Sequence, residues 1–236
     1  MTATSPSSWQ QPLSSSKEVI AQRRRSRLRF KVPRISPSRK LEGGAARGNC
    51  NLDGGKKIQM QALLPNTNIG LTTAEKPTFF FQVSQTPVQE AKFILLNDQG
   101  DTIIYEKTFP LTKTGGVMSF TLPADADALE VGKEYSWEVV VNCDPVDQKG
   151  NPRVEGSIKR VQPNAELVSN LAKVPIRDRV DLYANQGYWY DSIKTLADLR
   201  RTNPNDPTLV NDWKDLLDSA GLNTLAQDPL LQCCTP

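Results

Sequence analysis

The feature that most constrains the fold is a series of short apolar runs between residues 58 and 161, bounded by Gly, Pro, Asn or Asp. Runs of this length, rich in β-branched and aromatic residues, favour strands over helices. Seven such runs within about 110 residues have the number and spacing of an antiparallel β-sandwich. The seven runs are residues 58–64, 78–83, 92–96, 102–105, 117–122, 134–141 and 154–161. The turn sequence Asn97–Gly100 predicts a hairpin between the third run and the fourth.

The segment before the sixth run resembles a corner of fibronectin type III domains. It reads Leu129-Glu130-Val131-Gly132-Lys133-Glu134-Tyr135. In that corner a Leu, a Gly and a Tyr hold the turn, and the phenol bonds to nearby backbone. The alternative is an ordinary loop leading into a strand. Trp137 lies on the same face of that strand as Tyr135, so we expect it in the core.

From residue 163 the apolar period changes from two to 3.6, which predicts helices. The expected helix starts are Asn164 as a cap, Pro175, Trp189, and the pair Asp206-Pro207, and the expected ends include Pro204 and Gly221. On the last helix we expect Val210, Trp213, Leu217 and Ala220 to face the core.

The two middle helices resemble a single tetratricopeptide repeat, because Tyr183, Gly187, Leu196 and Pro204 fall at the spacings of that repeat. One unit alone cannot bury its apolar face, so we expect a helical hairpin that packs on the β-body. Tyr188, Trp189 and Tyr190 begin the second of these helices, where three large rings are not expected to be buried together. Two alternatives follow: packing against the sandwich, or a partner-binding patch.

The charge is divided unevenly along the chain. Residues 1–49 contain eleven basic and two acidic side chains, a net charge of +9, whereas residues 50–236 contain 18 basic and 24 acidic ones, a net charge of −6. Ser, Pro, Gln and Arg dominate the N-terminal part, so residues 1–45 are predicted to form a disordered arm that contributes nothing to folding. The run Arg23, Arg24, Arg25, Arg27 and Arg29 is the candidate anion-binding part of this arm.

The alternative for this basic run is a solvated tail without a ligand. Phe30 is its one nearby aromatic residue, so stacking on nucleobases is poorly supported. A third interpretation concerns export, because Val19-Ile20-Ala21 resembles a signal cleavage site, although residues 9–18 lack the apolar core of a signal peptide.

The chain has no histidine, which excludes imidazole bases, Ser-His and Cys-His nucleophile pairs, and zinc sites that use imidazole. It has no phosphate-binding glycine motif, no CxxC pair and no apolar run of membrane-spanning length. Asp144, Asp147 and Glu155 lie near one loop, but their spacing is not that of a calcium hand. We therefore predict no catalytic residue, no metal site and no cofactor.

The cysteines divide into a body pair and a tail pair. Cys50 and Cys143 lie at strand margins of the predicted sandwich, which favours a disulfide between them. The alternative is two separate buried thiols. Cys233 and Cys234 are adjacent in the C-terminal tail, where no specific role is predicted.

Several segments are similar to one known family. They are GGAARGNC (43–50), PTFFFQV (77–83), LEVGKEYSWEVVVNCD (129–144), VEGSIKRV (154–161) and GYWYDSIKTLADLR (187–200). On these motifs the chain, from about residue 43 to 230, resembles the cyanobacterial domain-of-unknown-function family 928. The resemblance implies no activity and no catalytic residues. It implies a secretory signal followed by a basic, Pro-rich stretch, and only the basic stretch is visible in this sequence.

These observations predict an α+β protein with a basic arm (1–45), an immunoglobulin or fibronectin type III-like antiparallel sandwich (46–162), a helical subdomain (163–230) and a flexible tail (231–236). The expected function is a non-enzymatic interaction or structural module of the cell envelope that meets a protein partner through its hairpin or a sheet edge. The alternative is a cytosolic adaptor whose arm binds nucleic acid or anionic membrane. Compartment distinguishes the two, and an extracytoplasmic location is the expectation.

Overall fold

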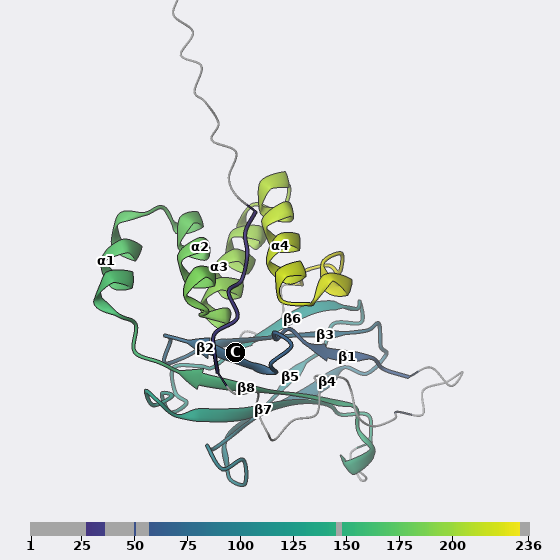
Figure 1. The fold of residues 1–236 in the computed structure, drawn as a ribbon. Helices are drawn as coiled ribbons and strands as arrows, with labels where there is room; N and C mark the ends of the chain where they lie inside the picture. The colour runs from purple at the N-terminus through teal and green to yellow at the C-terminus, as the bar shows by residue number, and fades with distance from the viewer. Residues whose placement is uncertain (1–26, 36–49, 51–56, 145–147, 232–236) are drawn as a thin grey trace, which may run out of the picture.

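The computed structural model describes residues 27–35, 50, 57–144 and 148–231 (Figure 1). Within these residues the chain forms eight β-strands followed by four α-helices, so the α+β prediction is confirmed. The strands are β1 (Met60–Ala62), β2 (Ile69–Thr72), β3 (Thr78–Val83), β4 (Glu90–Leu96), β5 (Ile103–Pro110), β6 (Gly116–Thr121), β7 (Glu134–Val141) and β8 (Arg153–Arg160). The helices are α1 (Ala165–Lys173), α2 (Ile176–Gln186), α3 (Trp189–Thr202) and α4 (Pro207–Ser219), and short 3-10 helices lie at Gln148–Gly150 and Asn223–Leu225.

Two sheets and the helices form three layers (Figure 1). The strand order is β1-β3-β6 in one sheet and β2-β8-β7-β4-β5 in the other. Phe79 of β3 faces the five-stranded sheet, where its ring centroid lies 4.7 Å from that of Phe93 and 5.5 Å from that of Trp137. Phe80 faces the helices, and the guanidinium of Arg201 in α3 lies over its ring. The three-stranded sheet is therefore the middle layer, which explains why β3 is an almost continuous apolar run.

Strand β2 has no counterpart among the seven predicted runs. It contains four residues and pairs in parallel with β8 after the chain crosses from one sheet to the other. Its Gly70 lies against α3, and a Cβ added there would come within 2.6 Å of the Tyr190 ring. A four-residue run interrupted by glycine gives no period-two signal, so the sequence pattern missed it.

The predicted turn and corner are both present. Strands β4 and β5 form an antiparallel hairpin, and Asn97 Oδ1 accepts a hydrogen bond from the N–H of Gly100, which has φ 75°. At the corner before β7, the N–H of Glu130 donates to the hydroxyl oxygen of Tyr135 at 3.0 Å. Gly132 has φ 87° in that corner, a conformation that favours glycine.

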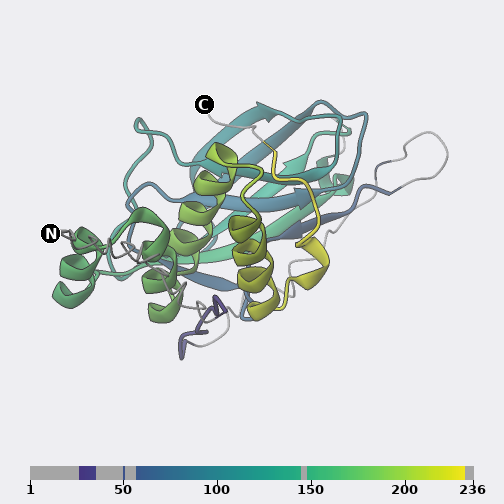
Figure 2. The ribbon, with the colours of Figure 1, turned by 90° about the horizontal axis from the view of Figure 1, so that it is seen from above.

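Helices α1 and α4 begin where their capping residues predict. Asn164 Oδ1 accepts from the N–H of Leu167 at 2.7 Å, and Asp206 Oδ1 accepts from the N–H of Thr208 at 2.8 Å. Helices α1 to α4 lie side by side in a row over the sheets (Figure 2). No helix in the described ranges is long and apolar enough to span a bilayer.

The expected buried face of α4 is wrong at one position. Val210 is 43% exposed, whereas Leu209, Trp213 and Leu217 are buried. The buried residues recur at intervals of four, and each step of one residue turns the helix by about 100°, so Val210 points away from that stripe.

Candidate interaction surfaces

Residues 27–35, which we call the strap, run in an extended path across the ends of the helices. The N–H of Phe30 donates to Ser219 Oγ at the end of α4 at 2.8 Å, and the N–H of Lys31 donates to the carbonyl of Ala184 in α2 at 3.0 Å. Figure 1 shows the strap in purple, descending along the helices toward β2. This part of the predicted disordered arm therefore packs on the body, and the expectation that it contributes nothing to folding is corrected here.

Side chains of the strap alternate between the protein and solvent. Leu28 and Phe30 are buried, at 5% and 6% exposure, while Arg27, Arg29 and Lys31 are exposed. The sequence Arg-Leu-Arg-Phe-Lys thus has the period of two typical of an extended segment with one buried face. The signal covers only five residues, whereas the composition of the whole basic arm is typical of disorder.

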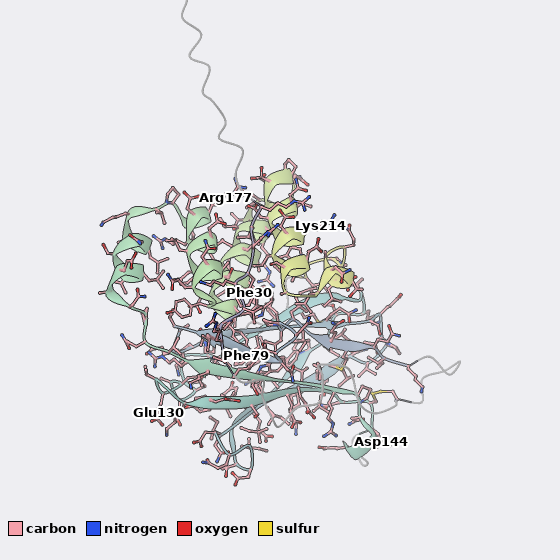
Figure 3. The ribbon with its side chains drawn as sticks, viewed as in Figure 1. Phe30, Phe79, Glu130, Asp144, Arg177 and Lys214 are labelled. Atoms are coloured by element: carbon pink, nitrogen blue, oxygen red, sulfur yellow. A yellow bond between two sulfur atoms is a disulfide. The ribbon has the colours of Figure 1, made fainter. Side chains whose placement is uncertain are left out.

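Trp189 lies beneath the strap, at the first residue of α3. The ring of Phe30 meets it edge-on, with centroids 4.9 Å apart, where the helices meet the sheets (Figure 3). The indole N–H of Trp189 donates to the carbonyl of Leu63 at 2.7 Å. Gly187, with φ 81°, leaves room for the strap, since a Cβ there would lie 3.1 Å from the carbonyl oxygen of Lys31. The strap, α3 and the link after β1 therefore form one packed unit.

Tyr190 joins α3 to the five-stranded sheet through two buried hydrogen bonds. The indole N–H of Trp137 in β7 donates to the Tyr190 hydroxyl at 2.8 Å, and that hydroxyl donates to the carbonyl of Ser157 in β8 at 3.0 Å. Burial raises the pKa of Tyr190, so the phenol keeps the proton that it donates. The helical layer is thus attached to the sandwich by a specific polar contact inside an apolar core.

Asp191 makes a second polar contact between α3 and the sheets. Its carboxylate oxygens accept from the backbone N–H of Thr73 at 3.0 Å and from Thr73 Oγ1 at 2.6 Å. Burial raises the pKa of this carboxyl, and the hydrogen bonds from Thr73 oppose that shift. No local sequence pattern connects Asp191 with Thr73, because the two residues are separated by 118 positions.

The three rings at the start of α3 are all buried, with exposures of 8% for Tyr188, 0% for Trp189 and 2% for Tyr190. The expectation that they could not be buried together is wrong. Tyr188 precedes the helix and packs with Leu71 and Leu167 in a separate apolar cluster, so it does not compete with the other two rings for space. The three rings pack inside the protein, as the first of the two alternatives predicts, and they offer no accessible patch to a partner.

The predicted disulfide between Cys50 and Cys143 is confirmed, with Cα atoms 5.8 Å apart. Cys50 is 6% exposed, and Cys143 follows the end of β7. Asp144, the next residue, lies at the end of the sandwich remote from the helices (Figure 3). Cys233 and Cys234 lie outside the described residues.

Of the candidate anion-binding arginines, the described residues include Arg27 and Arg29, and both are exposed. Arg23, Arg24 and Arg25 lie outside the described residues. Arg27 Nε lies 4.0 Å from an oxygen of Asp215, with 81% of the Arg27 side chain exposed, so this ion pair stabilises little. The two arginines line an open concavity of about 400 Å³ beside α4.

A smaller concavity of about 240 Å³ lies on the outer face of the five-stranded sheet. Glu138, which lines this concavity, lies opposite Glu155 in the β7–β8 ladder. Burial and the negative charge of Glu155 raise the pKa of Glu138, whereas the positive charge of Arg153 lowers it. Arg153 lies 4.0 Å from Glu138, and Lys92 lies 3.7 Å from Glu106, so these charges are largely compensated. No group of three or more His, Cys, Asp or Glu in the described ranges could hold a metal ion, and Asp147 lies outside them.

Strand β5 is an edge strand that pairs with β4 on one side. At the opposite end of this sheet, α3 packs against β2. In the other sheet, the C-terminal segment bonds to the edge of β6, where the N–H of Val117 donates to the carbonyl of Pro229 at 2.8 Å. Side chains on β5 remain accessible, with Ile103 at 51% and Ile104 at 37% exposure. Strand β5 therefore presents an open edge with exposed side chains.

The hydrogen-bonding register of β5 shows which of its backbone N–H groups point away from β4. The N–H of Leu111 donates to the carbonyl of Gln89, and Phe109 lies opposite Ala91 in the same register. In an antiparallel ladder alternate residues bond to one neighbour, so the backbone N–H groups of Glu106 and Thr108 point to the open edge.

One comparison with known proteins gives a match. The model of a family described as Domain of Unknown Function (DUF928) matches residues 42–230, most of the 236-residue chain. The matched range begins after the strap and includes the whole sandwich and the four helices. A search of curated proteins finds no match to the chain.

Proposed function

Because this chain belongs to the DUF928 family, which brings no activity with it, we propose from the structure alone that the protein is a non-enzymatic interaction or structural module of the cell envelope. The observation that carries the proposal is the Cys50–Cys143 disulfide. Disulfides persist in oxidising compartments and are rare where glutathione and thioredoxin keep thiols reduced. That chemistry supports an extracytoplasmic location.

The disulfide also fits a stabilising role in such a compartment. It closes a span of 93 positions, from the segment before β1 to the residues after β7. Chain-entropy reasoning assigns up to about 4–5 kcal/mol to a closed loop of this size. A bond that contributes on this scale favours a compartment in which it stays oxidised.

We further propose that a protein partner binds by adding a strand to the open edge of β5. The free N–H groups of Glu106 and Thr108 are available for main-chain hydrogen bonds, and the exposed Ile103 and Ile104 add apolar contact. Charged residues at Glu106 and Lys107 disfavour pairing of this edge with a second copy, because like charges would approach each other. The occupant is therefore an extended segment of a different protein.

A substitution that removes one edge donor tests this surface. Thr108→Pro deletes an N–H that points away from β4, so the β4–β5 ladder keeps its hydrogen bonds. Thr108→Val is the matched control, since it retains the N–H. Tagged protein isolated from its own cells should recover the same partner with the wild type and with Thr108→Val, and lose it with Thr108→Pro. Equal recovery with all three proteins would exclude strand addition at β5.

The alternative function is a cytosolic adaptor whose basic arm binds nucleic acid or anionic membrane. The exposed Arg27 and Arg29 favour an anionic ligand in either compartment. Fractionation of cells separates the two functions: the envelope module is found with extracytoplasmic proteins, and the adaptor is found with cytosolic ones.

We also infer an immunoglobulin or fibronectin type III-like identity for the sandwich. When β2 is left aside, β1, β3 and β6 form one sheet, and β8, β7, β4 and β5 form the other. This is the arrangement of strands A, B, E and of strands G, F, C, C′ in that fold. The Tyr135 corner before β7 supports the same assignment. The hairpin of α2 and α3, with Gly187 in the left-handed region between the helices, supports a tetratricopeptide-like unit.

A further inference from the structure

We propose that the strap is a docking element for an anionic phospholipid membrane surface. The inference goes beyond the envelope function and does not depend on the β5 edge. It rests on four cations that the strap holds at the protein surface, Arg27, Arg29, Lys31 and Arg34, all of which are exposed.

Anchoring by Leu28 and Phe30 gives this row of cations its geometry. Because these two side chains are buried, the alternate residues Arg27, Arg29 and Lys31 must point outward together. Residues two apart in an extended segment are separated by about 7 Å, so the row presents a line of charges in one direction. The backbone hydrogen bonds from Phe30 to Ser219 and from Lys31 to Ala184 hold this line on the helical layer.

The charge of the strap is distinct from that of the body. The strap contains four basic residues and no acidic residue, whereas residues 50–236 have a net charge of −6. An anionic surface attracts the strap and repels the body, so the protein approaches the surface strap-first. Arg27 is the one cation of the row with a described acidic partner, at 4.0 Å, and its side chain remains 81% exposed.

The structure favours a lipid surface over nucleic acid. Phe30, the only aromatic residue of the strap, is 6% exposed and packs on Trp189, so it cannot stack on a nucleobase. Val32, next to Lys31, is 46% exposed instead. An exposed aliphatic residue within a row of cations suits the membrane interface, where apolar contact adds to attraction by anionic headgroups.

Sedimentation of the full chain with lipid vesicles tests the proposal. The vesicles contain phosphatidylcholine alone or an equal mixture of phosphatidylcholine and phosphatidylglycerol. The test variant combines Arg29→Gln, Lys31→Gln and Arg34→Gln, all at exposed positions. The matched control combines Lys107→Gln, Lys113→Gln and Lys133→Gln, exposed lysines of the sandwich, and lowers the net charge by the same amount. Thermal melts check that both variants fold as the wild type does.

We expect binding to the anionic vesicles that weakens with added salt, and little binding to phosphatidylcholine alone. Each cation removed from the strap should lower the partition coefficient about five-fold, and the triple variant about 100-fold, while the control changes it much less. Equal losses in the test and control variants, or no binding of the folded wild type, would overturn the proposal. Tighter binding to a single-stranded oligonucleotide than to the vesicles would overturn it in favour of nucleic acid.

Discussion

Substitution of Tyr190 by Phe tests whether α3 is attached to the sandwich by the polar contact seen at its hydroxyl. The substitution keeps the ring and removes one oxygen. The indole N–H of Trp137 then loses its acceptor, and the carbonyl of Ser157 loses a donor, both inside the core. A buried polar group without a partner costs about 1–3 kcal/mol, and the carbonyl of Ser157 can retain other bonds, so the expected loss of unfolding free energy is about 3 kcal/mol.

For a chain of this length a loss of about 3 kcal/mol lowers the melting temperature by roughly 6–12 °C. Tyr188→Phe is the matched control, because Tyr188 is a neighbouring tyrosine that packs in the separate cluster with Leu71. We expect the control to cost less than about 1 kcal/mol. Urea unfolding, followed by far-ultraviolet circular dichroism, measures both variants.

A double-mutant cycle with Trp137→Phe separates the hydrogen bond from general packing. If Trp137 and Tyr190 act together, the double variant should lose less free energy than the sum of the single losses, by about 1 kcal/mol or more. Additive losses, or a Tyr190→Phe variant as stable as Tyr188→Phe, would refute the reasoning that this contact attaches the helices to the sandwich.

Three further predictions, made with four substitutions, concern other buried contacts of the helices and the strap. Trp213→Ala should cost about 3–5 kcal/mol in urea unfolding, since the ring is 0% exposed; a loss under about 1 kcal/mol would mean that this face of α4 is accessible. Phe30→Ala should cost about 2–3 kcal/mol and Arg29→Ala less than about 0.5 kcal/mol, because one side chain is buried and the other exposed; equal losses would show that the strap is not packed. Burial raises the pKa of the Asp191 carboxyl above the ordinary value of about 3.9. Ionisation of this carboxyl therefore opposes folding, and the free energy of unfolding falls as the pH rises from about 3.9 to the raised pKa. Asp191→Asn should remove this pH dependence, and an unchanged slope in unfolding free energy against pH would contradict the shift.

Local patterns in the sequence predicted the parts of the fold that depend on neighbouring residues. The run Glu134–Val141 is rich in β-branched and aromatic residues and forms a full strand, and Asn164 and Asp206 cap helices with hydrogen bonds from residues two or three positions ahead. Such signals need no knowledge of distant contacts. Strand β2 gave no such signal, because Gly70 interrupts its short run and its pairing with β8 joins distant residues.

The candidate surfaces were less predictable, since they depend on contacts between remote segments. Tyr190 meets Ser157 across 33 positions and Trp137 across 53, and periodicity contains no information about such separations. The packing of the strap was not predicted either, although a local pattern indicates it, because Leu28 and Phe30 alternate with basic residues. This alternation is the pattern of an extended segment with one buried face.

The central claim, a disulfide-stabilised module of the cell envelope, is tested most directly by peptide mapping without reductant on the full-length protein taken from fractionated native cells. Free thiols are alkylated at lysis, before denaturation and digestion. We predict that the peptides of Cys50 and Cys143 are recovered as one linked species from an extracytoplasmic fraction. Recovery of both cysteines as separately alkylated peptides, in protein found with the cytosol, would contradict the claim.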